Sequence, residues 1–273
     1  MRISCLPVSL FGDILSGKTS LVEFAGDAKK IGYDHMDISN MFIKNRNPTY
    51  MAPFKAALDE VGLPIFMMNA YPDFTHPDPV QRVREFDYLV SDIALASQLS
   101  VECVRILAGQ AHPETSRKYG IDYVVKAFHE IAAYGKKYGV GLLYEDHSKP
   151  GAWFMVDFSF PPDIFLEIFQ QTEDTDIALN FDTGNITAFG GDPMDILPQV
   201  FHRIRAIHVS DMSERGRFSP ANIGEGVVPN REVFRYLKAH GYTGVLSIEE
   251  ASGRGLLGIR EAYRFVRRAW DEA

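Results

Sequence analysis

The sequence contains little of what marks several large classes of protein. It has only two cysteines, Cys5 and Cys103, in 273 residues. Each lies within a short apolar run typical of a strand, so we expect two buried thiols, with a disulfide between them as the alternative. No apolar run approaches the roughly 20 residues of a membrane-spanning helix. The N-terminal segment is too short and too interrupted for a secretory signal, so we expect a cytoplasmic protein without a membrane partner.

An excess of positive charge is also missing. The chain has 28 lysines and arginines against 36 aspartates and glutamates, a formal net charge of -8. Binding to a phosphate backbone requires clustered lysine and arginine, so we expect no nucleic-acid partner. A metal ion in an acidic site can still bind an anion, so a phosphorylated small molecule is not excluded. No Ser/Gly-rich linker divides the chain, which predicts one domain over residues 1–273.

Short β-branched or aromatic runs alternate eight times with longer runs of helical period. This pattern predicts an α/β fold, a single (β/α)8 TIM barrel, because eight strand–helix units close into a barrel. The expected strands are Ile3–Ser9, His35–Ser39, Pro64–Ala70, Cys103–Leu107, Val140–Asp146, Ile177–Asp182, Ala206–Ser210 and Val245–Glu249. The expected helices begin near Ser20, Tyr50, Pro79, Ile121, Pro162, Pro193, Asn230 and Leu256.

Four acidic or imidazole side chains stand at the ends of four successive expected strands: Glu145, Asp182, His208 and Glu249. Parallel strands of a barrel end at one mouth, where active sites of this architecture lie. Three carboxylates and one imidazole form a mostly oxygen site that suits a divalent cation. Each residue alone could equally be a helix cap, a salt-bridge partner or a structural histidine. The prediction of a metal site depends on the four together.

Strand alternation separates Glu249 from its neighbour Glu250. If Glu249 faces the barrel interior, Ser247 shares its face, whereas Leu246 and Ile248 point toward the helices. Glu250 then points toward the helices, on the same face as Leu246 and Ile248. The sequence therefore predicts that Glu249 is the metal ligand.

Four stretches, LLYEDH, NFDTGN, IHVSD and GEGVVPNREVFRYLKAHGYTGVLSIE, resemble the xylose isomerase-like TIM barrel superfamily, in its sugar phosphate isomerase/epimerase branch. The resemblance implies one divalent ion (Mn²⁺, Mg²⁺, Co²⁺ or Zn²⁺) bound by Glu145, Asp182, His208 and Glu249. It also implies that Glu145 and Glu249 are catalytic and move protons on the substrate, and that the protein is a homodimer or homotetramer. Ketose 3-epimerases of this family carry a further glutamate shortly after the first ligand. Here that stretch reads SKPGAW, and Asn185 stands where some members have a histidine, so a strict ketose 3-epimerase is disfavoured.

Several polar or aromatic side chains follow the expected strands at the same rim. Their alternatives are ordinary loop, solvated or core positions, and the aromatic residue could also form a subunit contact. The candidates for substrate binding are His147, Lys149, Asn69, His112, Arg217 and Trp153.

Together these features predict a metal-dependent sugar isomerase or epimerase for a small ketose or related hydroxy-ketone. A cation would stabilise the enediolate formed when a carboxylate removes the proton next to the carbonyl. The alternative is a lyase of inosose-dehydratase type, acting on a cyclic polyol ketone or a 3-keto-glycoside. Abasic-site DNA endonucleases share the barrel, but their extra histidine ligands are absent and the net charge is negative. A barrel that only binds sugar would not need both glutamates.

Overall fold

The computed structural model describes residues 1–273 and contains eight strands that form one parallel sheet. The strands are β1 (Arg2–Leu6), β2 (Met36–Ser39), β3 (Ile65–Asn69), β4 (Cys103–Ile106), β5 (Gly141–Glu145), β6 (Ala178–Asp182), β7 (Ile204–Val209) and β8 (Val245–Glu249). The helices are α1 (Phe11–Ser16), α2 (Leu21–Ile31), α3 (Pro48–Val61), α4 (Pro79–Gln98), α5 (Arg117–Tyr138), α6 (Pro162–Gln171), α7 (Thr183–Phe189), α8 (Pro193–Val200), α9 (Asn230–Ala239) and α10 (Gly255–Glu272).

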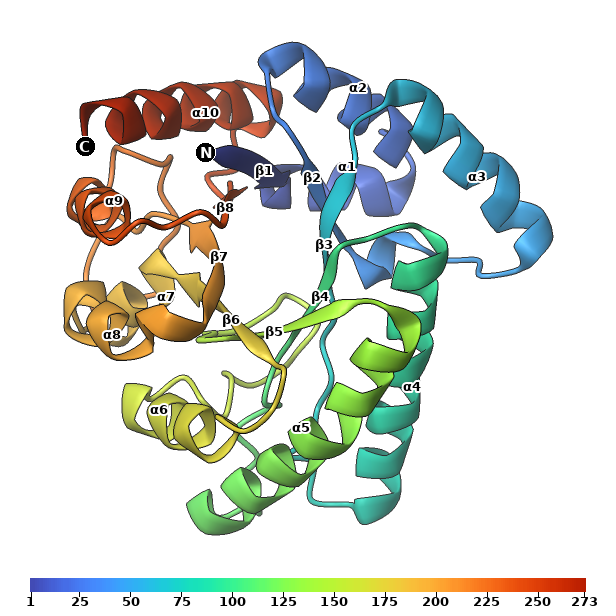
Figure 1. Ribbon diagram of the computed structural model, residues 1–273, viewed down its shortest axis with the longest axis vertical. Coiled ribbons are helices and arrows are strands. Elements are labelled where there is room, and N and C mark those ends of the chain that lie inside the picture. The colour runs from blue at the N-terminus through green and yellow to red at the C-terminus, as the bar shows by residue number, and fades with distance from the viewer.

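The strands follow one another around a nearly closed barrel in the order β1-β8-β7-β6-β5-β4-β3-β2, and helices surround them (Figure 1). β1 and β2 close the circle without a regular ladder. The backbone amides of Asp34 and His35 both donate to the carbonyl oxygen of Ile3, at 3.0 and 3.2 Å. The predicted TIM barrel is therefore confirmed.

Local sequence signals explain where most helices begin and end. Ser20 caps α2, with its hydroxyl accepting from the amide of Glu23 while the Glu23 carboxylate accepts from the amide of Ser20. α5 ends at Gly139, whose φ of 69° lies in the left-handed region that glycine adopts without strain. The chain then enters β5. α2 and α3 end in the same way, at the left-handed Gly32 and Gly62.

The structure differs from the expected elements at two places. The first strand stops at Leu6, because Pro7 follows it and a 3₁₀ turn over Val8–Leu10 leads directly into α1. Neither α1 nor α7 was among the expected helices. α7 begins immediately after β6, where the Asp182 carboxylate accepts from the amides of Gly184 and Asn185 and so caps the new helix.

The apolar residues form two layers, one inside the barrel and one between the strands and the helices. The large outer layer contains Tyr144, Phe181 and Ile248, whereas the small inner cluster contains Leu143 and Val245. This division follows the alternation of side chains along each strand. Both cysteines are free and buried, as expected, with Cys5 in the outer layer and Cys103 in the inner one.

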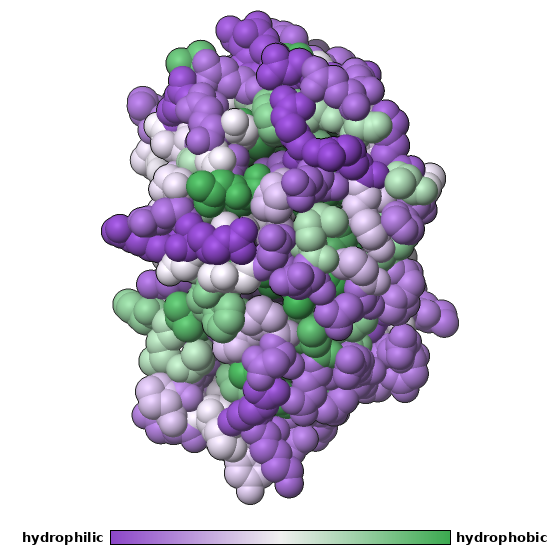
Figure 2. Space-filling view, turned by 90° about the vertical axis from the view of Figure 1, so that its left-hand side faces the viewer, coloured by the Kyte–Doolittle hydropathy of each residue, from purple (hydrophilic) through white to green (hydrophobic).

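The outer face of the helical layer is mostly polar. Hydrophilic residues cover most of the side of the barrel shown in Figure 2, and the apolar areas there are small and separated. Such a surface is typical of amphipathic helices that bury one face against a sheet. No helix has both the length and the apolar character needed to cross a membrane.

Candidate metal centre

The four strand-end side chains meet at the carboxyl end of the barrel. One ligand atom from each of Glu145, Asp182, His208 and Glu249 lies within 4.8 Å of the other three. Two ligands of one ion are separated by at most about twice a metal–ligand distance, or about 4–5 Å. The four donors are thus close enough to share one ion.

The imidazole of His208 lies between two of the carboxylates. Its Nδ1 lies 2.7 Å from Oε1 of Glu145 and 3.0 Å from Oε2 of Glu249. The His208 and Glu145 side chains are fully buried, whereas that of Glu249 is 21% exposed. Glu249 is therefore the member of the group that reaches furthest toward the solvent side of the mouth.

Asp182 serves two purposes with its two carboxylate oxygens. Oδ1 accepts from the amides of Gly184 and Asn185, at 2.7 and 2.8 Å, and from the hydroxyl of Ser210 at 2.8 Å. These three donors fix the orientation of the carboxylate. Oδ2 makes no hydrogen bond within the protein, which leaves it available for another ligand.

Glu145 is held by an arginine buried inside the barrel. Nε of Arg105, on β4, lies 2.8 Å from Oε2 of Glu145, and both side chains are almost completely inaccessible to solvent. Arg105 also donates to Oδ1 of Asn69 at 2.9 Å, and its guanidinium lies 4.8 Å from the ring centroid of Tyr71. The arginine is thus fixed on several sides, and one oxygen of Glu145 is fixed with it.

The electrostatics of the group favour added positive charge. The pKa of Asp182 is raised to about 8, first by burial and then by the charges of Glu249 and Glu145. Burial alone would lower the pKa of His208, but the charges and hydrogen bonds of Glu145 and Glu249 outweigh it and raise that pKa well above its usual value. Both shifts mean that the cluster binds protons strongly. A divalent cation would supply the same compensation, so the donor set fits a metal ion by charge as well as by spacing.

Of the side chains predicted to bind substrate, His147 lies nearest to this centre along the chain. It is buried, its Nδ1 has no hydrogen-bond partner, and burial followed by the charges of Arg105 and His208 lowers its pKa well below the usual value. Lys149, two residues further on, is exposed.

The other candidates are distributed around the rim and already have protein neighbours or lie in solvent. Asn69 is fully buried between the carbonyl oxygen of Ile38 and Arg105. His112 contacts Oδ2 of Asp73 through Nε2 at 2.8 Å. Trp153 is buried in the loop after β5, whereas Phe154 beside it is 92% exposed. Arg217 is exposed and pairs with Glu214. The structure therefore gathers the four predicted metal ligands more closely than the predicted substrate contacts.

The buried charged residues near the centre that the sequence analysis missed include Arg105 and Asp37. Both lie inside strands rather than at strand ends, in the runs CVRI and MDIS. A charged side chain inside a four-residue strand with otherwise apolar neighbours is unusual, because burying a charge is costly unless it is paired. That signal could have identified both.

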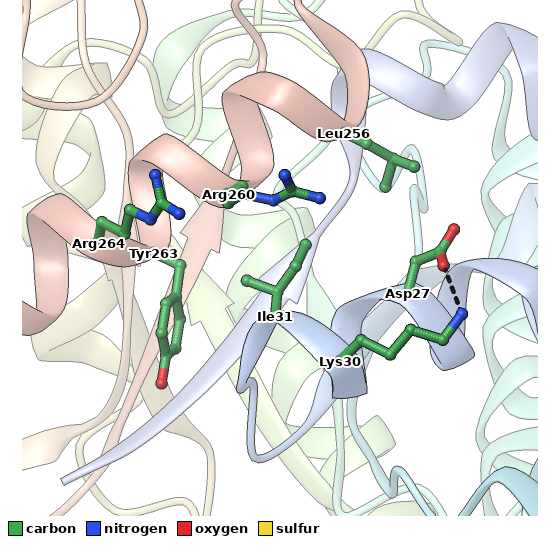
Figure 3. Close-up of a pocket in the computed structure, with 7 residues that line it drawn as sticks. All are labelled: Asp27, Lys30, Ile31, Leu256, Arg260, Tyr263 and Arg264. Carbon is green, nitrogen blue, oxygen red and sulfur yellow. Dashed lines mark hydrogen bonds and ion pairs between the residues drawn. The ribbon is translucent and has the colours of Figure 1, made fainter.

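A separate groove of about 360 Å³ lies on the outside of the barrel between α2 and α10 (Figure 3). Its lining combines Ile31 and Tyr263 with the arginines Arg260 and Arg264, and Lys30 pairs with Asp27 at 3.1 Å. It contains one carboxylate and no histidine, so it has no resemblance to the donor set at the mouth.

Comparison with known proteins agrees with the barrel. The sequence model of the family described as xylose isomerase-like TIM barrel matches residues 25–269. This chain belongs to that family. No curated protein matches the sequence significantly.

Solved structures of related enzymes share the fold at low sequence identity. An L-ribulose 3-epimerase superposes with a TM-score of 0.79 at 16% identity, over 99% of this chain and 95% of the other. The probable 3-DHS dehydratase AsbF from Bacillus anthracis gives 0.76 at 16% identity, over 98% and 99%. The IOLI protein with a bound zinc atom gives 0.75 at 17% identity, over 98% and 96%. At such identities the likeness establishes the fold alone.

Proposed function

We propose that this protein is a divalent-metal-dependent sugar isomerase or epimerase that acts on a small ketose or a related hydroxy-ketone. The observation that carries the proposal is the convergence of three carboxylates and one imidazole within 4.8 Å at the carboxyl end of a TIM barrel. Enzymes among its structural neighbours, which include an L-ribulose 3-epimerase, and a neighbour with bound zinc support it.

The four ligands differ in their exposure to solvent and in how firmly other residues hold them, which suggests a division of roles. An ion bound by Glu145, Asp182, His208 and Glu249 would polarise the substrate carbonyl and acidify the neighbouring C–H bond. Glu249, the only partly exposed member of the set, removes the proton from carbon. Glu145 returns it, while Arg105 holds the other oxygen of that carboxylate. Return of the proton to the opposite face of the same carbon gives an epimer, and return to the adjacent carbon gives an isomer.

Sealing of the site is part of the same proposal. Glu145, Asp182 and His208 are each at most 1% exposed, so bulk water has little access to the donors. A dry site strengthens the interaction between the carboxylates and any cation they hold. We also propose, on family membership, that the working form is a homodimer or homotetramer with a small sugar or polyol substrate.

A second candidate is a lyase that removes a hydroxyl group from a cyclic polyol ketone or a 3-keto-glycoside. His147 favours it, because a buried imidazole with an unpartnered Nδ1 two residues after Glu145 is a further group able to transfer a proton. Two carboxylates suffice for an epimerase, whereas elimination also needs a donor for the leaving hydroxyl. The probable dehydratase among the structural neighbours is consistent with this candidate.

One screen separates the two candidates. Chelator-stripped protein would be supplied with Mn²⁺, Mg²⁺, Co²⁺ or Zn²⁺ and incubated in D₂O with ketoses, inososes and 3-keto-glycosides, with NMR as the readout. An isomerase or epimerase incorporates deuterium at carbon and forms a sugar isomer. A lyase consumes substrate and forms an absorbing enone without an isomer. The absence of both changes with every ion and substrate would contradict the proposal.

A further inference from the structure

A buried carboxylate lies beneath the candidate metal centre. Asp37, on β2, is completely inaccessible to solvent. Its Oδ1 accepts from the hydroxyl of Ser4 at 2.6 Å and from the amide of Met67 at 3.1 Å, and its Oδ2 accepts from the hydroxyl of Ser247. The groups around it come from β1, β3 and β8, so the carboxylate is held in place from several strands.

This carboxylate faces the side of His208 that points away from the other ligands. Nδ1 of His208 lies among Glu145 and Glu249, whereas Nε2 is buried without a hydrogen-bond partner. Oδ2 of Asp37 is 3.9 Å from that Nε2. The register of the sheet explains the approach, because Ser247, which donates to the same oxygen, is paired with His208 on one side and with Ser4 on the other.

The position of the proton on the imidazole ring decides which of its nitrogens can bind a metal ion. A neutral imidazole carries one proton, and only the nitrogen without it can bind a cation. For Nδ1 of His208 to bind an ion beside Glu145 and Glu249, the proton must reside on Nε2. Metal-binding histidines commonly donate their second N–H to a carboxylate, which fixes both the tautomer and the orientation of the ring.

We propose that Asp37 is a positioning residue that holds His208 with Nε2 protonated and directed at Oδ2, so that Nδ1 faces the ion. This inference rests on the proposed metal site and adds a residue to it that contacts neither ion nor substrate. A purely structural role in satisfying Ser4 and Ser247 would not need a charge, because two hydroxyls and an amide can be accommodated by neutral groups at lower cost. A carboxylate at this position is explained by the imidazole above it.

The test compares the same amide substitution at two buried aspartates. Asp37→Asn preserves the shape of the side chain, but an NH₂ group takes the place of one carboxylate oxygen. The oxygen that is lost is either the one that faces Nε2 of His208 or the one that accepts from Ser4. Asp92→Asn is the matched control, because Asp92 is also buried but lies on α4 outside the barrel, beside Asn40 and Arg46. Isothermal titration of the chelator-stripped proteins with Zn²⁺ gives the affinities. We expect Asp37→Asn to weaken zinc binding by about 10- to 100-fold and Asp92→Asn to leave it unchanged.

A second measurement reads the tautomer directly and needs no substitution in Asp37. Long-range ¹H–¹⁵N spectra of histidine-labelled, zinc-loaded wild-type protein report which ring nitrogen carries the proton, and His208→Asn identifies the His208 signals. We expect Nε2 protonated and Nδ1 bound to zinc. A proton on Nδ1 would overturn the role of Asp37, even if Asp37→Asn did not fold.

The possible failures are distinguishable. If wild-type protein binds no zinc, the metal site and the role of Asp37 are both wrong. If wild-type binds zinc and Asp37→Asn binds it equally well, only the role of Asp37 is wrong. If Asp92→Asn weakens binding as much as Asp37→Asn, the effect is a general loss of stability and the inference is overturned.

Discussion

The two halves of the barrel contribute different parts of the candidate centre. β5 to β8 supply all four donors, Glu145, Asp182, His208 and Glu249. β1 to β4 supply none of them but provide the buried polar groups behind them, with Asp37 below His208 and Arg105 beside Glu145. One half therefore presents the ligands, and the other supports two of them, Glu145 and His208. Substitutions in the first should remove activity or ion binding outright, and those in the second should weaken them or the fold.

We call β5 to β8 the ligand half and β1 to β4 the supporting half. The largest effect is expected at Glu249, the partly exposed ligand of the ligand half. Glu249→Gln removes the carboxylate that we propose takes the proton, so turnover should fall by about 10²- to 10⁴-fold. The control is Glu250→Gln, because Glu250 is buried outside the cluster and accepts from the amide of Ser252 at 2.9 Å. Deuterium exchange at substrate carbon measures both variants. Equal losses in the two variants would deny Glu249 a specific role.

The supporting half should show its largest effect in stability. Arg105→Met leaves Oε2 of the buried Glu145 carboxylate without its cationic partner, while His208 remains beside Oε1. We expect this loss to cost about 3 kcal/mol in the free energy of unfolding. Arg117 is the comparison, since it is exposed and pairs with Asp163 and Glu167 on the surface. Arg117→Met should cost about 1 kcal/mol or less. Urea unfolding of the ion-free proteins gives both values, and similar costs would show that Arg105 is not a specific support.

Ion binding itself should stabilise the fold through the ligand half. At an ion concentration about 100 times the dissociation constant, the free energy of unfolding should rise by about 2.7 kcal/mol. Asp182→Asn should abolish this gain while the amide still caps α7. Asp192→Asn makes the same change at the cap of α8, on the surface, and should keep the gain. Thermal unfolding of each protein with and without Mn²⁺ measures this gain in stability. A gain that persists in Asp182→Asn would place the ion elsewhere.

The smallest expected effect is the pH dependence of ion affinity. Protons and the ion compete for the same donors, and the pKa values of Asp182 and His208 are both raised in the ion-free protein. Affinity should therefore increase with pH between about pH 6 and about pH 9, on either side of the Asp182 pKa of about 8. Titration calorimetry in buffers with different ionisation enthalpies should show proton release on binding. Affinity that is independent of pH over this range would contradict the geometry.

The same contrast explains how much the sequence could predict. The ligand half was readable because each donor is the last or next-to-last residue of a strand, and parallel strands of a barrel end together. Glu249 could be distinguished from Glu250 because alternation assigns the two to opposite faces. The extent of the first strand was wrong where Pro7 intervenes, and α7 was missed because Asp182 both ends a strand and caps a helix.

The supporting half was not readable in the same way. Asp37 and Arg105 are separated from their partners by 171 and 40 residues along the chain, and only the closed barrel brings them together (208 − 37 and 145 − 105). A lone charge inside a strand does not reveal what it faces. Substrate contacts could not be read from periodicity for a similar reason, because the positions of Lys149, Trp153 and Arg217 depend on long loops whose conformation no periodic pattern determines.

The central claim is that four side chains of the second half bind a single divalent ion. Crystals grown with Zn²⁺ and measured at the zinc absorption edge test it most directly. The account predicts one anomalous peak per chain, about 2.0–2.2 Å from an oxygen of Glu145, Asp182 and Glu249 and from Nδ1 of His208. A peak bound by other residues, or no peak at this end of the barrel, would contradict it.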